Sequence, residues 1–137
     1  SRILMLKTGL IFCLIIGFTL SCETSYEQKI IGEWRLDSAY YHYNQFNFSS
    51  HGWHQEETYK YLPTGEAITS AVNSSVSNKF SIEDKRLKYF DSNGELVNIY
   101  DILSIDGKNM VLRTDKKPIF KGKNQNRFEV RYFSKMN

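Results

Sequence analysis

Cysteine, proline and apolar runs long enough to cross a membrane are scarce in this chain. Among its 137 residues are only two cysteines and two prolines. Cys13 lies inside an uncharged apolar stretch near the N-terminus and Cys22 lies at its end. The remaining sequence contains no cysteine and therefore cannot form an internal disulfide, even in an oxidising compartment. Its fold must rest on a hydrophobic core.

The apolar stretch is too short for a membrane span. Arg2 and Lys7 precede an uncharged segment from Thr8 to Cys22, whereas a spanning helix needs about 20 apolar residues. A basic start followed by a short apolar centre is typical of a signal peptide. We expect residues 1–21 to be such a peptide and exclude them from the folded domain.

A net charge of one sign is also lacking in the rest of the chain. The 18 basic residues fall to 16 when Arg2 and Lys7 are set aside, and they face 15 acidic residues. The chain beyond the signal is therefore close to neutral. Charge offers no reason to expect a nucleic-acid partner or an anionic surface as partner.

Recognisable catalytic motifs are missing as well. No serine, cysteine or lysine stands in a nucleophile motif, and no glycine-rich loop opens a helix. His51, His54 and Glu56 are potential metal ligands, but their spacing matches no zinc motif, and we interpret them as solvated loop residues. We predict no enzymatic activity, no cofactor and no metal site.

What the sequence does contain is repeated alternation of polar and apolar residues. From Gly32 to Tyr43, Trp34, Leu36, Tyr40 and His42 occupy one set of alternate positions, the period of a half-buried strand. Seven further strands are expected around residues 57–61, 67–72, 80–82, 87–89, 96–105, 110–112 and 127–134. Residues 44–55 are polar and predict a loop that covers the end of the fold, with Trp53 exposed in it. The apolar residues of 96–105 occupy both alternate sets, which indicates a β-bulge or a partly covered outer face.

Turn signals separate these eight strands, and no helical pattern alternates with them. This excludes a parallel α/β sheet. The sequence predicts an all-β fold, an eight-stranded antiparallel up-and-down β-barrel, because closure removes exposed strand edges. A two-sheet sandwich is the alternative. We place the domain at residues 29–137, behind a polar tether at residues 22–28.

The segment Ile31-Gly32-Glu33-Trp34 resembles the Gly-x-Trp start of lipocalins. The chain from here on is similar to small lipocalin-like domains of lipoproteins from Bacteroidetes-type bacteria, in which an aromatic strand ends at a glycine turn, here Tyr59 to Gly65. The resemblance implies that Trp34 closes one end of the barrel. It also implies that an arginine of the last strand, here Arg131, packs over this tryptophan.

Thr19-Leu20-Ser21-Cys22 resembles the lipobox of bacterial lipoproteins, whose cysteine receives diacylglycerol. The resemblance implies a protein anchored by lipid at Cys22 in the bacterial cell envelope, more specifically at the outer membrane. A plain secretory signal with an incidental cysteine is the alternative.

Lipocalins mostly bind small apolar molecules inside the barrel, and a barrel of eight strands either is filled by side chains or holds one small ligand. The expected ligand-contacting residues are aromatic: Tyr40, Tyr59, Tyr61, Phe80, Tyr89, Tyr100 and Tyr132. Leu36, Ile82, Leu87, Met110, Leu112 and Phe128 complete the expected interior. Two functions follow. One is the binding of a small apolar or amphipathic ligand, and the other is contact between a filled barrel and an unidentified envelope protein.

Overall fold

A computed structural model describes residues 24–44, 46–51, 56–117 and 125–136. Expectations for residues 1–21 and for Cys22, Trp53 and His54 lie outside these ranges.

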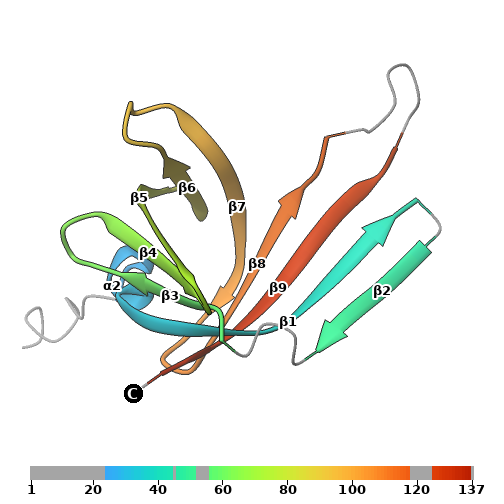
Figure 1. Cartoon of the computed structure of the whole chain (residues 1–137), viewed down its shortest axis with the longest axis horizontal. Helices are drawn as coiled ribbons and strands as arrows, with labels where there is room; N and C mark the ends of the chain where they lie inside the picture. Colours follow the sequence, from blue (N-terminus) through green and yellow to red (C-terminus); the bar gives the residue numbers. More distant parts are fainter. Residues whose placement is uncertain (1–23, 45, 52–55, 118–124, 137) are drawn as a thin grey trace, which may run out of the picture.

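The described chain is nearly all β, as predicted (Figure 1). A helix, α2 (Tyr26–Ile30), precedes the strands. These are β1 (Gly32–Tyr43), β2 (Phe46–His51), β3 (Thr58–Tyr61), β4 (Glu66–Ala71), β5 (Ser74–Glu83), β6 (Arg86–Phe90), β7 (Leu96–Ile105), β8 (Asn109–Asp115) and β9 (Arg127–Lys135). All pairings are antiparallel, and β1, β3 and the strands that follow are neighbours in chain order. Pairing of β9 with β1 closes an eight-stranded barrel, with β2 as an additional strand.

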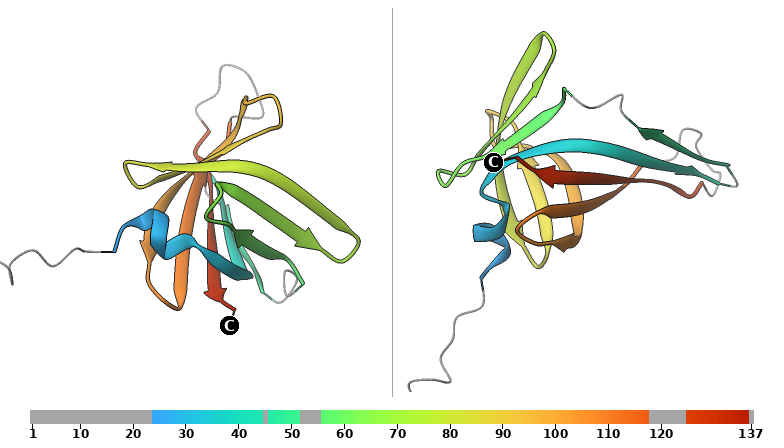
Figure 2. Two further views of the ribbon diagram at one scale, coloured as in Figure 1. Left: turned by 90° about the vertical axis from the view of Figure 1, so that its left-hand side faces the viewer. Right: turned by 90° about the horizontal axis from the view of Figure 1, so that it is seen from below.

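Strand β1 is long enough to take two different partners on one side. Gly32–Arg35 pair with β3, and Ser38–Tyr43 pair with β2. On its other side, β1 pairs with β9 over nearly its full length. We call the part of the sheet that β3 does not reach the arm; it consists of β2, residues 38–43 of β1 and residues 127–132 of β9, and β8 pairs along its β9 side. Figures 1 and 2 show β2 and the adjoining half of β1 extending away from β3 and β4.

The expectation of a loop throughout residues 44–55 is wrong, because Phe46–His51 form β2. Tyr43 and Phe46 face each other across the hairpin, so only two residues connect the strands. The first of them, Asn44, has φ of +51°, a conformation that asparagine tolerates better than most residues. The alternation of Phe46, Asn47 and Phe48 after an asparagine was the sequence signal for this hairpin.

Trp34 and α2 close one end of the barrel, as predicted for Trp34. The indole is fully buried, and its Nε1 donates a hydrogen bond of 2.8 Å to the carbonyl oxygen of Ile30, the last residue of α2. Ser25 caps the helix by accepting from the backbone N–H of Gln28 at 3.3 Å. Part of the segment expected to be a polar tether is therefore a helix packed on the core.

A β-bulge in β1 exchanges the two faces of the arm. The pairing with β9 shifts between Leu36 and Ser38, so Asp37 is an additional residue on β1. Trp34 and Leu36 face the interior before the bulge, and Ala39 faces it afterwards. Tyr40 is consequently turned to the outer face, where its ring lies 6.1 Å from that of Phe128.

Strand β9 also presents the opposite face to the one predicted. Phe133 and Glu129 are buried, whereas 43% of Tyr132 is exposed. The expectation that Tyr40, Phe128 and Tyr132 line the interior is therefore wrong. It assumed that the charged residues of β9 face solvent, but two of them, Glu129 and Arg131, are paired with each other on the inner face.

Strand β7 has the bounds predicted for it and contains two bulges. Its register shifts beside Val97, opposite β6, and beside Leu103, opposite β8. Both side chains are more than half exposed. Bulging explains why apolar residues occupy both alternate sets of this strand.

Candidate ligand-binding cavity in the barrel

An open cavity of about 170 Å³ is lined by residues of the barrel strands, among them Val97, Asn98 and Tyr100 in the first half of β7. Residues from seven strands line it: Tyr59, Thr69, Asn78, Tyr89, Val97, Asn98, Tyr100, Leu112, Arg131 and Phe133. For comparison, an engineered apolar cavity of about 150 Å³ holds one benzene molecule, whereas drug-sized ligands occupy about 300 to 1,000 Å³. This cavity therefore has room for one ring or a short chain.

Aromatic rings form most of the wall and hold one another in place. Tyr59 meets Phe133 edge to face, with ring centroids 5.2 Å apart, and Tyr89 meets Tyr100 in the same way at 5.6 Å. Edge-to-face packing adds about 0.5 to 1.5 kcal/mol per pair beyond the burial of surface. The hydroxyls of Tyr61 and Tyr89 are hydrogen-bonded. Tyr61 also packs edge to face on Phe80, at 5.2 Å. The wall is thus ordered without a ligand.

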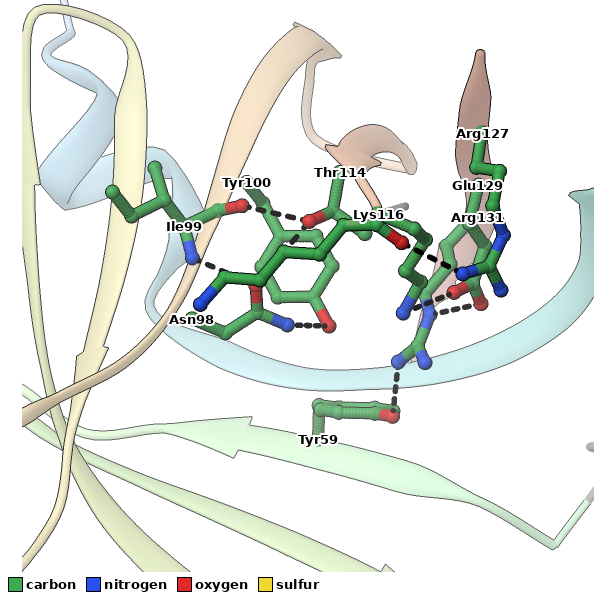
Figure 3. A network of polar contacts seen from close by, with 10 residues as sticks. Tyr59, Asn98, Ile99, Tyr100, Thr114, Lys116, Arg127, Glu129 and Arg131 are labelled. Atoms are coloured by element: carbon green, nitrogen blue, oxygen red, sulfur yellow. Dashed lines mark hydrogen bonds and ion pairs between the residues drawn. The ribbon is translucent and has the colours of Figure 1, made fainter. Parts of the chain in front are cut away.

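Among the residues that the structure describes, Arg131 is the one charged residue that lines the cavity. Figure 3 shows its contacts with Tyr59 and Glu129. Its Nη1 donates to the Tyr59 hydroxyl at 2.9 Å, and its Nε donates to Glu129 Oε1 at 2.7 Å. The guanidinium carbon lies 5.6 Å from the centre of the Tyr100 ring. These contacts fix the guanidinium plane. About a fifth of the side chain remains exposed, so N–H groups not used by Tyr59 and Glu129 are open to solvent or to a ligand.

Glu129 is 2% exposed and lies between two cations. Arg131 contacts one of its carboxylate oxygens, and Lys116 Nζ lies 3.1 Å from the other. Burial alone would raise the pKa of Glu129, but the charges and hydrogen bonds of Arg131 and Lys116 outweigh it and hold this pKa below its usual value. Burial likewise disfavours the charged form of Arg131, but Tyr100, Tyr59 and Glu129 more than offset this and raise its pKa. Both groups therefore stay ionised near neutral pH.

A second set of hydrogen bonds orients Tyr100. Asn98 Nδ2 donates to the Tyr100 hydroxyl at 3.0 Å, and Thr114 Oγ1 lies 3.2 Å from Asn98 Oδ1. Thr114 is buried and also contacts the carbonyl oxygen of Ile99 at 2.9 Å. Among the described residues, no buried side-chain nitrogen or oxygen lacks a hydrogen-bond partner. Hydrogen bonds thus hold the polar side chains of the cavity (Figure 3).

The tyrosines around the cavity are neutral phenols. Burial raises the pKa of Tyr59, Tyr61, Tyr89 and Tyr100 above the usual value of a phenol. Their hydroxyls can therefore both donate and accept hydrogen bonds at neutral pH. With Arg131 and Asn98, they give an aromatic cavity a polar rim.

The structure brings together only part of the predicted ligand-contacting set. Tyr59, Tyr89 and Tyr100 line the cavity. Tyr61 packs against Tyr89 of this lining and against Phe80. Tyr40 and Tyr132 lie on the outer face of the arm, in a separate groove with Ser38, Ser49 and His51. Sequence reasoning missed Asn98, Thr114 and Glu129, whose roles depend on neighbours on other strands.

Arg131 does not pack over Trp34 as the resemblance implied. Trp34 is paired with Lys135 across β1 and β9, and the Lys135 ammonium lies 5.2 Å from the indole centre. Arg131 is paired with Ala39, well beyond the bulge. The antiparallel closure of first and last strands was predicted correctly, but the cation that reaches Trp34 comes from a position four residues later.

Two further properties concern the described residues as a whole. No group of three or more histidine, cysteine, aspartate or glutamate side chains in the ranges given above is arranged to hold a metal ion. None of the helices there is long and apolar enough to span a membrane.

Comparison of the chain with known proteins gives no match to a family model, to a curated protein or to a solved structure.

Proposed function

We propose that this protein is a non-catalytic, lipocalin-like lipoprotein of the bacterial cell envelope that binds a small amphipathic molecule in its barrel. The observation that supports this most directly is the open cavity of about 170 Å³, which combines an aromatic wall with the guanidinium of Arg131. A barrel filled by its own side chains would leave no cavity of this size. The aromatic rings suit one ring or a short chain of the ligand, and Arg131 and the tyrosine hydroxyls suit a polar group next to it.

The position of α2 supports a particular orientation for an anchored protein. The helix cap, Ser25, follows Cys22 by three residues, which span about 11 Å at most. A lipid on Cys22 would hold the α2 end of the barrel beside the membrane.

Native mass spectrometry of the gently purified protein tests the binding proposal, with the unfolded protein as mass reference. We expect a reproducible excess mass that disappears on unfolding and belongs to an amphipathic compound. Thr69→Phe should abolish the excess mass, because Thr69 lines the cavity and a phenyl ring would occupy it. Ile68→Phe is the matched control, since neighbouring residues of a strand point to opposite faces. A bare mass, with no uptake from a lipid extract, would contradict ligand binding.

A second candidate function is contact with another envelope protein. It is favoured by the apolar residues that the arm exposes, which include Phe46 and Phe48. A bare mass together with co-purification of one envelope protein, lost when Phe48 is replaced by serine, would support it.

A further inference from the structure

Strand β2 is the unpaired edge of an otherwise closed sheet. Within the described part of the chain, the eight barrel strands each have two neighbours over at least part of their length, whereas β2 pairs only with β1. Every second residue of β2 therefore directs its backbone N–H and C=O away from the protein. Such an edge is a template for another strand. Proteins usually protect it with lysine or other charged residues, or with proline.

The edge of β2 has none of these protections. Phe46–His51 contain no lysine, arginine, aspartate, glutamate or proline. His51 is its one titratable residue. A neutral strand can lie against an identical strand without bringing like charges together, which a charged edge strand could not do.

The face that β2 shares with the barrel interior is aromatic and largely uncovered. Phe46 is 71% exposed and Phe48 is 59% exposed. Phe48 stacks on Tyr41 of β1, with ring centroids 4.9 Å apart and planes 17° from parallel. The row of stacked rings thus ends at the open edge, with nothing among the described residues beyond Phe48.

We propose that β2 pairs antiparallel with β2 of a second copy of this chain, about a two-fold axis at Phe48. In this register each Phe48 faces Phe48 of the other copy, and each Phe46 faces Ser50. Residues directly opposite in an antiparallel pair lie on the same face. The aromatic row then runs without interruption from Tyr41 of one copy to Tyr41 of the other.

The expected dimer is symmetric and weak. A strand of six residues, with its side chains, buries less than the roughly 1,200 to 2,000 Å² typical of stable complexes. A two-fold axis makes the contact self-complementary and closes the assembly at two copies. Association should therefore be seen at micromolar concentration and reverse on dilution.

Sedimentation velocity of the purified protein, from about 1 µM to about 500 µM, measures this association in the range where small interfaces assemble. We expect a reversible monomer–dimer equilibrium. Phe48→Lys should raise the dimer dissociation constant at least about tenfold, because it places two ammonium groups opposite each other. Leu103→Lys is the matched control: Leu103 is 55% exposed on β7, which has neighbours on both sides, and it does not line the cavity. Its dissociation constant should change less than about twofold.

A protein that stays monomeric throughout this concentration range overturns the proposal. The edge of β2 would then be available to a strand of a different protein. Equal effects of the two lysine substitutions also overturn it. Circular dichroism verifies that both variants are folded.

Cysteine cross-linking tests the register independently of stability. In a background with Cys13 and Cys22 replaced by serine, Phe48→Cys should form a disulfide-linked dimer readily under mild oxidation. Phe46→Cys should not, because Phe46 faces Ser50 of the other copy. A mixture of Phe46→Cys and Ser50→Cys should cross-link as a heterodimer. Efficient cross-linking at 46 alone, or none at 48, contradicts this register.

Discussion

Arg131 donates a hydrogen bond of 2.9 Å to the hydroxyl of Tyr59, a residue 72 positions earlier in the chain. The bond joins β9 to β3 across the interior, since β1 lies between these two strands in the sheet. The same guanidinium neutralises the buried carboxylate of Glu129. The Arg131 side chain thus holds Tyr59 of the cavity wall in place and also pairs with the buried Glu129 carboxylate.

Replacement of Arg131 by methionine should lower the free energy of unfolding by about 3 kcal/mol, because it leaves a buried carboxylate with one partner fewer. Urea denaturation measures the change. Arg113→Met is the control: Arg113 lies over Phe128 on the outer face and bonds to a largely exposed carboxylate, that of Asp115. It should cost less than about 1 kcal/mol. Similar losses in the two variants would show that Arg131 is not an internal charge partner.

Glu129 should make the protein sensitive to acid. Its pKa is lower in the folded than in the unfolded chain. The stabilisation is therefore complete above the ordinary pKa of a glutamate, about 4.3, and is lost as the pH falls through the lowered folded value. Melting temperatures measured between about pH 3 and pH 6 should fall on acidification, and Glu129→Gln should flatten this dependence. An equally steep curve in the variant would assign the acid sensitivity to other groups.

Substitution of Trp34 by phenylalanine should destabilise the protein by about 3 kcal/mol. It removes part of a fully buried side chain and leaves the carbonyl oxygen of Ile30 without its donor. Hydrogen exchange should additionally show faster exchange in α2, whose C-terminus this bond holds. A variant with unchanged exchange in α2 would mean that the helix is held by packing alone.

Gly32 cannot be replaced without strain. It has φ of +130°, and a Cβ added there would come within 2.9 Å of Lys135 Cε. Gly32→Ala should therefore cost more than about 1 kcal/mol, most of it from the backbone. Gly107→Ala is the matched control, because a Cβ at that position meets nothing within 4 Å. Thermal unfolding of both variants measures the difference, and equal midpoints would contradict it.

The amino-acid sequence by itself determined the eight barrel strands and their order, though not β2. Alternation and turn residues located β1 and β7 with their observed bounds. The Gly-x-Trp motif identified Trp34 as the residue that closes one end. These features are local, since strand period, turn chemistry and glycine conformation depend on residues close in the chain.

Only the tertiary structure decided which side chains face the cavity. One additional residue, Asp37, reverses the face of everything that follows in β1, because the side-chain period of a strand is two. Glu129 and Arg131 are buried because they pair with each other on β9 and because Tyr59, brought in from β3, accepts a hydrogen bond from Arg131. From the alternation of its own strand alone, a charged residue is expected to be exposed. Its burial depends on the partners that barrel closure brings to it.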